Sequence, residues 1–561
     1  MNNFVIDIIN KDLEKYENLD VITRFPPEPN GNLHLGHAKS IYWNTKIAKI
    51  YNGKCNLRFD DTNPSVERQE YVDNILRDIK WLIGSIEDNF DNIFFTSDYF
   101  DRIYQFAREL IEKGFAYVCD LNKDEIKNNR GDISLLGKSS IYRKRSVEEN
   151  LYLFEQMRYG IFEDESKTLR AKIDMESPNF HMRDPILYRI NKKDKHYKTK
   201  NNWCIYPTYD FAHAISDIIE NITYSISTLE FEMHKPLYKW IINNIKSIYE
   251  FPKRIEFSKL NLNYLIMSKR KLLTLIDNKC VCDWDDPRLP TLSGIKERGY
   301  TSQSILNFIE EVNLTKRENI IDTSLLEHHA RRELNKISQR IMVVINPIKL
   351  IIDNYPEDQI QQLDAVNNPE DLKKGKRTID FSKVLYIDKS DFTEDQISGF
   401  NRLSIGKKVK LKYSYIIHCN NVVKNTAGEI EEIHCNYLSS TLNTLKYDGE
   451  KIKGIIHWVS KEHCVNICLN VYDRLFTQID VSNIQKEDIV NFFNKNSIEK
   501  INNCYSEKCI LDKVKETSYF QLERIGYFYF SKRESLLNNI ITLNKTVVLN
   551  NLWKPHILNN L

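Results

Sequence analysis

Apolar positions in the first half of the chain switch repeatedly between the two-residue period of strands and the longer period of helices. Residues 55–59 are apolar at every second position and predict a strand that ends at Asp60. A helical pattern follows over 71–79, and another over 104–111 has Gly114 as its C-terminal stop. Strands that alternate with helices predict an α/β fold with a doubly wound parallel sheet.

Residues 100–205 interrupt this alternation, with irregular turns around Gly131 and Gly137. Strand patterns resume at 203–206 and at 224–229, so we interpret 100–205 as an insertion between the two halves of the sheet. Helical periodicity then continues to about residue 338.

Beyond Arg340, short alternating runs such as 409–413 and 455–459 predict β structure, and the turn at 424–429 fits a hairpin. We therefore expect a multidomain protein, α/β followed by all-β, with C-terminal antiparallel β-barrels. The predicted boundaries are 1–99 and 206–284 for the two halves of the α/β domain, 100–205 for the insertion, 285–338 for a helical connector and 339–561 for two β-barrels.

Composition narrows the possible class of protein. A chain of 561 residues can form several domains, and its net charge of +2 means that a nucleic-acid partner must bind local basic patches. The 11 cysteines lack zinc-ligand spacing, so we expect free thiols, a reducing compartment and no resident metal. Residues 1–20 carry acidic side chains and no long apolar run, and no segment reaches transmembrane length. We expect a cytoplasmic protein with no membrane anchor.

The segment 21–40 carries the most informative chemistry. It places an apolar strand, a Pro/Gly turn and a helix start in order, and His34 and His37 project from one face of the first helical turn. Gly36 lacks a side chain, which lets a flat ring approach the backbone. Backbone N–H groups and the helix dipole favour a phosphate there. The segment predicts a nucleotide site, although two histidines at this spacing can simply cap a helix.

A second candidate segment is the basic run at 265–272, which follows a strand-like run at 254–257. A loop near strand ends can carry the ammonium group of Lys269 into a site and neutralise charge that develops on phosphate. The alternative is a solvated basic turn.

Two further segments of the sequence place a strand end directly before a helix start. Asp60 and Asp61 follow the strand at 55–59, where a carboxylate can bind a ligand's ammonium group, although Asp61 can instead cap the next helix. Tyr209 and His213 lie four residues apart after 204–207 and can line one wall of a pocket or pack in the core.

These motifs resemble those of the class I aminoacyl-tRNA synthetases. The run Arg24–Ser40 resembles their HIGH motif, and Leu265–Leu272 resembles their KMSKS loop, with Ile266 and Arg270 replacing its leading lysine and last serine. From about residue 20 onward the chain resembles the glutaminyl-tRNA synthetases. The resemblance implies a Rossmann-type catalytic domain that joins L-glutamine to tRNA(Gln) through a glutaminyl-adenylate, using ATP with substrate-associated Mg²⁺ and releasing AMP and pyrophosphate.

The resemblance also implies the site residues. His34, His37 and Lys269 would be catalytic. Asp60 would hold the α-amino group of glutamine and Tyr209 would meet the carboxamide, with Arg24 and His213 beside them. The implied ATP-binding residues are Glu28, Pro29, Asn30, His34, Leu35, Gly36, His37, Ala38, Lys39, Ser40, Thr228, Lys259, Leu260, Met267, Ser268 and Lys269.

Contacts with tRNA follow from the same resemblance, which also leads us to expect a monomer. The insertion would grip the acceptor end, with Ile133 as an apolar wedge. The implied contacts at the inside corner of the tRNA are Thr315, Lys316, Arg317 and Asn319. The implied anticodon-reading residues in the β-barrels are Arg340, Arg402, Gln521 and Arg524.

Three departures from the family pattern bear on specificity. Residues 232–236 replace an aspartate followed by two arginines, which puts acceptor-stem readout in doubt. Arg254 stands in place of a pocket glutamine and Ser227 in place of a frequent cysteine. A guanidinium there favours glutamate, because a carboxylate pairs with it better than an amide does. Asn401 replaces a basic residue before Arg402.

Two alternatives follow. One is a glutamyl-tRNA synthetase of the archaeal or eukaryotic type, which shares the architecture. The other is a non-catalytic tRNA-binding paralogue, and the presence of His34, His37, Asp60, Tyr209 and Lys269 argues against it.

Overall fold

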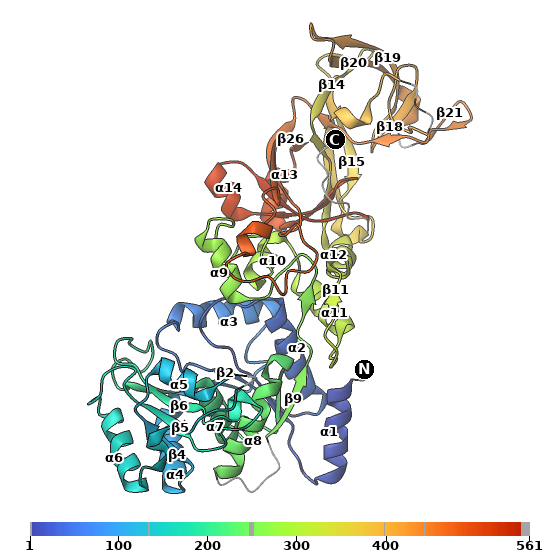
Figure 1. Ribbon diagram of the computed structural model, residues 1–561. Coiled ribbons are helices and arrows are strands. Elements are labelled where there is room, and N and C mark those ends of the chain that lie inside the picture. Colours follow the sequence, from blue (N-terminus) through green and yellow to red (C-terminus); the bar gives the residue numbers. More distant parts are fainter. Residues whose placement is uncertain are drawn as a thin grey trace. The chain divides into compact units, whose positions relative to one another are not determined.

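The computed structural model describes residues 3–132, 135–245, 252–395, 397, 399–442 and 444–550 (Figure 1). They form two compact units. The first unit comprises residues 1–261, 267–269 and 309–321, and the second comprises residues 262–266, 270–308 and 322–561.

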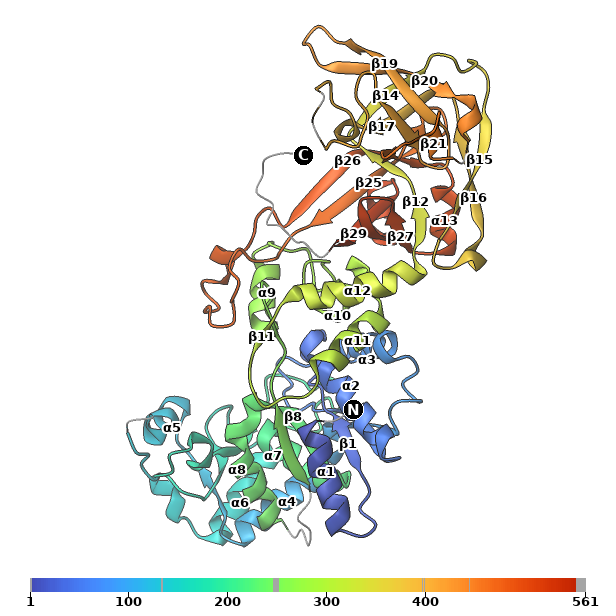
Figure 2. The ribbon, with the colours of Figure 1, turned by 90° about the vertical axis from the view of Figure 1, so that its right-hand side faces the viewer.

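A parallel sheet organises the first unit. Strands β1 (Ile22–Phe25), β2 (Lys54–Phe59) and β3 (Asn92–Phe95) pair in parallel in that order, and β8 (Tyr224–Thr228) pairs with β9 (Lys253–Phe257). Strand β8 lies beside β1, because the amide of Thr223 donates to the carbonyl of Ile22 at 3.0 Å (Figure 2). The chain therefore winds outward in both directions from β1, as predicted. In such a sheet the crevice at the carboxyl ends of the central strands binds ligands.

Helices surround this sheet. The α3 helix (Gln69–Ile83) buries residues at the predicted helical spacing, among them Val72, Ile75 and Ile79. Gly114 follows α4 (Phe100–Glu112) with a φ of +74°, which confirms it as the helix stop. The helices of the sheet region are α1 (Phe4–Lys15), α2 (Leu35–Ile50), α3 (Gln69–Ile83), α7 (Tyr209–Ile219) and α8 (Lys235–Asn244), with η4 (Leu229–His234) between β8 and α8.

The segment predicted as an insertion contains an antiparallel sheet of four strands in the order β4-β5-β6-β7. One apolar core includes Ile103, Phe154 and Tyr188 from this segment together with Ile215 of α7 and Ile241 of α8. The insertion is therefore packed onto the second half of the sheet domain. Its elements are η1 (Thr96–Tyr99), α4 (Phe100–Glu112), β4 (Ala116–Cys119), α5 (Lys123–Arg130), η2 (Ile141–Lys144), α6 (Val147–Arg158), β5 (Thr168–Ala171), η3 (Phe180–Met182), β6 (Ile186–Ile190) and β7 (Ile205–Pro207).

The region 285–338 is largely helical, as predicted. Its elements are α10 (Leu292–Arg298), α11 (Ser302–Val312), β11 (Ile320–Ile321) and α12 (Thr323–Ile337). The elements β10 (Asn261–Leu262) and α9 (Lys269–Asp277) precede it.

Beyond residue 338, two seven-stranded sheets follow, in the orders β12-β27-β28-β29-β25-β26-β13 and β23-β18-β19-β20-β14-β17-β24 (Figure 2). The two edge strands of the first sheet are separated in sequence only by Met342, and those of the second only by His457 and Trp458. Each sheet therefore curls until its edges meet at one short stretch of chain, as in a barrel.

The expectation of purely antiparallel barrels is wrong, because β12–β27, β25–β29, β14–β20 and β18–β23 pair in parallel. The hairpin predicted at 424–429 is confirmed by the antiparallel pair β19–β20. The strands of the second unit are β12 (Gln339–Ile341), β13 (Val343–Ile345), β14 (Pro347–Ile352), β15 (Gln361–Val366), β16 (Lys376–Phe381), β17 (Val384–Asp388), β18 (Lys408–Leu411), β19 (Ile416–Lys424), β20 (Ile430–Leu438), β21 (Lys446–Tyr447), β22 (Glu450–Lys451), β23 (Ile455–Ile456), β24 (Val459–Ser460), β25 (Cys464–Tyr472), β26 (Ile498–Glu507), β27 (Tyr519–Leu522), β28 (Gly526–Phe530) and β29 (Thr542–Val548). Its remaining helices are η5 (Leu372–Lys374), η6 (Lys389–Asp391), η7 (Ser439–Thr441), η8 (Ile489–Phe492), α13 (Ile510–Glu516) and α14 (Lys532–Asn538).

Within the described residues, every helix is too short or too polar to cross a membrane.

Candidate active site

The turn between β1 and α2 is held by its two histidines. His34 is the N-cap of α2, and its Nδ1 accepts a hydrogen bond from the Gly36 amide at 3.1 Å. The Nδ1 of His37 accepts one from the His34 amide at 3.1 Å. In a neutral imidazole only one nitrogen carries a proton. Because both Nδ1 atoms accept, both rings carry their proton on Nε2 and can donate from there.

Electrostatics keep both imidazoles neutral. Burial and the ammonium of Lys269 lower the pKa of His34 to about 3. Burial, His34 and Lys269 likewise lower the pKa of His37 well below its usual range. The two histidines therefore cap the helix, which confirms the capping interpretation, and they also present N–H donors. Their role in ligand binding stays a prediction.

The flat ring that approaches Gly36 is that of His34 itself. A Cβ at Gly36 would lie 2.9 Å from His34 Cε1. The absence of a side chain at Gly36 therefore leaves room for the capping imidazole, a role that differs from the ligand contact expected from the sequence.

Lys269 reaches the same turn from the distant basic segment. It begins α9, and its Nζ donates to Asn30 Oδ1 at 3.0 Å and to the Gly31 carbonyl at 3.4 Å. Burial lowers the pKa of Lys269 to about 8, against the opposing effect of the Glu28 carboxylate. The ammonium thus remains mostly charged at neutral pH and lies where the sequence hypothesis required it.

A cavity of about 330 Å³ lies at this point and collects most of the predicted ligand residues. The predicted residues that line it are Arg24, Glu28, Asn30, His34, Gly36, His37, Ser40, Tyr209, His213, Thr228, Lys259, Leu260, Met267 and Lys269. The predicted residues outside the lining are Pro29, Leu35, Ala38, Lys39, Ser268 and Asp60. Of these, Lys39 is buried and donates to the Ser258 carbonyl at 3.0 Å, so it fixes the end of β9.

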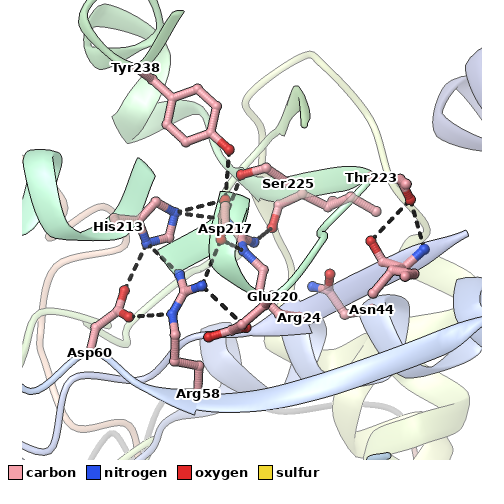
Figure 3. Close-up of polar contacts among 12 residues, drawn as sticks. Arg24, Asn44, Arg58, Asp60, His213, Asp217, Glu220, Thr223, Ser225 and Tyr238 are labelled. Carbon is pink, nitrogen blue, oxygen red and sulfur yellow. Dashed lines mark hydrogen bonds and ion pairs between the residues drawn. The ribbon is translucent and has the colours of Figure 1, made fainter. Parts of the chain in front are cut away.

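A buried network of charges, which includes Arg24 and His213 of the cavity lining, joins β1, β2, α7 and α8 (Figure 3). Asp217 Oδ1 accepts from Arg24 Nε at 3.1 Å and from Arg58 Nη1 at 2.8 Å, and its Oδ2 accepts from the Tyr238 hydroxyl at 2.7 Å. Burial alone would raise the pKa of Asp217, but Arg24, His213 and Arg58 outweigh burial and lower it strongly. The network fixes Arg24 and His213 at the cavity wall.

Asp60 belongs to this network (Figure 3). Its carboxylate accepts from Arg58 Nε at 2.7 Å and from His213 Nδ1 at 2.7 Å. Burial is outweighed by Arg58 and His213, so the pKa of Asp60 falls to about 2. In this structure the ionised Asp60 orients His213. Its assignment to the amino group of glutamine stays a prediction.

Asp61 does not cap the next helix, so that alternative is wrong. It accepts from the amide and hydroxyl of Ser97, each at 2.7 Å, whereas the N-cap of α3 is Arg68. Burial raises the pKa of Asp61 to about 7. The carboxylate anchors η1 to the end of β2.

Aromatic side chains form part of the cavity wall, and the unusual Arg254 lies behind them. The Tyr209 ring stacks on His213 at 5.0 Å and lies 5.7 Å from Phe231. The buried Arg254 guanidinium lies over Phe231 at 5.5 Å and over Tyr238 at 5.1 Å, with Glu256 3.6 Å from its Nε. It therefore places a positive charge behind the aromatic wall of the cavity.

Sequence reasoning missed several residues of this site. Asp217, Arg58 and Tyr238 organise the network, and Phe231 and Phe257 line the cavity. Asp217 had a signal, since it lies four residues after His213 on the same face of α7. The roles of Phe231 and Phe257 depend on how β8, η4 and β9 pack, which local spacing does not encode.

A second cavity, of about 920 Å³, lies within the second unit. Arg402 and Arg524 line it together with Lys410, Lys412 and Lys453, and the predicted anticodon contacts of the two arginines stay a prediction. The two arginines bracket the buried Asp391, with Nε of Arg402 at 3.3 Å and Nη2 of Arg524 at 2.6 Å from its Oδ1. Phe400 and Tyr413 add aromatic faces, a combination that suits single-stranded RNA.

Other predicted tRNA residues have different surroundings. The guanidinium of Arg340 donates to carbonyls of Asn335 and Ser338 at the end of α12, and Gln521 lies opposite Arg340 in the β12–β27 register. The segment of Thr315, Lys316, Arg317 and Asn319 is exposed and belongs to the first unit. Ile133 lies outside the described residues.

Comparison with known proteins agrees with this geometry. Residues 20–336 match the family model "tRNA synthetases class I (E and Q), catalytic domain", and residues 338–438 and 455–531 match two models of the "anti-codon binding domain" of the same class. The glutamine–tRNA ligase of Proteus mirabilis is 47% identical over 551 residues, covering 98% of this chain and 97% of that protein. The glutamine–tRNA ligase of Clostridium perfringens is 45% identical, covering 98% and 99% respectively.

The chain belongs to the glutamine–tRNA ligase family. Membership confirms the resemblance inferred from the two motifs and makes the chain a class I aminoacyl-tRNA synthetase. A solved glutamate tRNA ligase from Elizabethkingia meningosepticum is similar at a TM-score of 0.43 and 18% identity, covering 57% of this chain and 70% of that one. The 330 Å³ cavity lies in the part matched by the class I (E and Q) catalytic-domain model. Most of the residues that line the basic cavity lie in the two parts matched by the anti-codon binding domain models.

Proposed function

We propose that the enzyme ligates L-glutamine to tRNA(Gln) in two steps at the 330 Å³ cavity. ATP first activates the glutamine carboxylate as glutaminyl-adenylate with release of pyrophosphate, and the 2′-hydroxyl of the terminal adenosine then takes the glutaminyl group and releases AMP. The observation that carries the proposal is that the histidine turn and Lys269 meet at one cavity although they are more than 230 residues apart in sequence.

The first step requires stabilisation of charge on phosphate, which the turn and Lys269 supply. The Nε2–H groups of His34 and His37, the ammonium of Lys269 and the N-terminal end of α2 all offer positive potential to one region. No side-chain nucleophile is involved, so positioning and charge stabilisation provide the catalysis. Mg²⁺ enters with ATP as part of the substrate.

The second half of the cavity would hold the amino acid. Arg24, His213 and Tyr209 line it, and the ionised carboxylate of Asp60 accepts a hydrogen bond from His213. We assign Asp60 to the α-ammonium group and Tyr209 to the carboxamide. The family assignment supports glutamine over glutamate, although the positive charge of Arg254 works in favour of glutamate.

For tRNA, we propose that residues 100–205 hold the acceptor end, that 285–338 form a connector, and that 339–561 bind the anticodon. The basic cavity with Arg402 and Arg524 supports the last assignment. We further propose that the enzyme acts as a monomer in the cytoplasm, where its tRNA substrate is charged.

Aminoacylation of tRNA(Gln) with labelled glutamine or glutamate tests this function. We expect AMP formation and charging with glutamine, and ATP–pyrophosphate exchange that depends on tRNA. Charging with glutamate alone, or tRNA binding without charging, would refute the proposal.

A further inference from the structure

Three potential metal ligands from separate segments converge next to the aromatic wall. They are His181 in η3, Asp210 in the first turn of α7, and His234 at the end of η4. One ligand atom from each lies within 4.8 Å of the others. His234 Nδ1 is 2.6 Å from Asp210 Oδ1, and the His181 and His234 rings are 3.7 Å apart between centroids.

The chemistry of this trio differs from that of an ordinary surface ion pair. Two imidazoles and one carboxylate are the ligand types that Zn²⁺ prefers, and three protein ligands leave a fourth position for water. All three residues are half-buried, so an ion could enter from solvent. Across the part of the chain that the structure describes, this is the one group of three His, Cys, Asp or Glu side chains with such spacing.

The surroundings hold the ligands in place. Asn179 Nδ2 donates to the Met233 carbonyl at 2.8 Å, which ties the segment before His181 to the residue before His234. The His234 ring also packs against Phe231, with the two ring centroids 5.6 Å apart. The guanidinium of Arg130 is a nearby positive charge that opposes a cation at this site.

We propose that His181, Asp210 and His234 form a Zn²⁺ site that links η3 of the insertion to α7 and η4. The link has a direct structural consequence. Asp210 follows Tyr209, and His234 is three residues after Phe231, so the ion would restrain two residues that line the 330 Å³ cavity. The site itself does not depend on which amino acid the enzyme activates.

Calorimetric titration of EDTA-treated full-length enzyme with ZnCl₂ tests the site. We expect one equivalent to bind, and His181→Ala or His234→Ala to weaken binding at least tenfold. His434→Ala is the matched control, because His434 also pairs with an aspartate, Asp353, at 2.7 Å but belongs to no group of three metal-ligand side chains among the described residues. Unchanged affinity in both test variants would overturn the proposal, as would the absence of binding by the original enzyme.

Two further measurements cover misfolding and the free thiols. Zn²⁺ should raise the melting temperature of the original enzyme and of His434→Ala but not of the two test variants, whose circular dichroism should match the original. Co²⁺ should give visible d–d bands without a near-ultraviolet thiolate band. A thiolate band at the first equivalent would place the ion on cysteine and overturn the assignment.

Discussion

Replacement of Gly36 by alanine should separate catalysis from stability. The new methyl group would lie 2.9 Å from His34 Cε1 and 3.0 Å from His34 Nδ1, so the imidazole must turn away. This rotation of the imidazole breaks the 3.1 Å hydrogen bond from the Gly36 amide and redirects the Nε2–H donor of His34.

In Gly36→Ala, two opposing effects on the free energy of unfolding nearly cancel. Loss of a helix N-cap costs about 1 kcal/mol, whereas alanine in place of glycine within a helix gains up to about 1 kcal/mol. The catalytic effect has no such compensation. Loss of one preorganised donor to a charged transition state costs about 3 kcal/mol, or roughly a 100-fold to 1,000-fold decrease in kcat.

Gly294→Ala provides the control. Gly294 also lies in the first turn of a helix, where its amide donates to the capping hydroxyl of Thr291 at 3.1 Å. An added Cβ would lie 2.5 Å from the backbone carbonyl of Asp286, which cannot rotate away, so about 1–3 kcal/mol of stability should be lost.

Tests of the two variants are ATP–pyrophosphate exchange in the presence of tRNA and urea unfolding. We expect Gly36→Ala to lose exchange activity but little stability, and Gly294→Ala to lose stability but little exchange activity. Full exchange activity in Gly36→Ala would refute the role assigned to the orientation of His34.

The remaining predictions address charge. Lys269→Ala should slow pyrophosphate exchange by at least 100-fold with tRNA affinity little changed in filter binding; equal losses in both would contradict its role at phosphate. Asp217→Asn leaves Arg24 and Arg58 without their shared buried carboxylate and should cost about 3–5 kcal/mol in urea unfolding. The control Asp512→Asn changes only an exposed ion pair and should leave the urea midpoint unchanged. Arg254→Gln removes a positive charge behind Tyr209 and should increase the preference for glutamine over glutamate in kcat/KM roughly tenfold; an unchanged ratio would show that this charge does not act on the substrate. Unfolded histidine takes up a proton below pH 6.5, whereas folded His34 does not until about pH 3. The free energy of unfolding should therefore fall as pH drops below 6.5, and His34 should contribute about 1.4 kcal/mol per pH unit to this fall. The substitution His34→Asn should remove that part of the slope.

The sequence was sufficient to locate the two segments that meet at the cavity, 21–40 and 265–272. Strand and helix periods placed β2, α3 and α4, and the spacing of His34 and His37 placed both rings on one turn of α2. These signals are local, because each depends on residues within a few positions of one another.

Features that depend on distant contacts were not predictable in the same way. The neutral Nε2–H form of both histidines follows from backbone hydrogen bonds, and the shared core of the insertion with α7 and α8 follows from packing. The parallel pairs in the two C-terminal sheets join segments far apart in the chain, such as β25 and β29. Alternation along a strand indicates which face is buried but not which strand is its neighbour.

The central claim is that the histidine turn and Lys269 bind the phosphates of a single ATP. A crystal structure with a non-hydrolysable ATP analogue and tRNA tests it most directly. The account predicts phosphate oxygens within hydrogen-bonding distance of His34 Nε2, His37 Nε2 and Lys269 Nζ. A triphosphate bound elsewhere, or Lys269 directed away from it, would contradict the account.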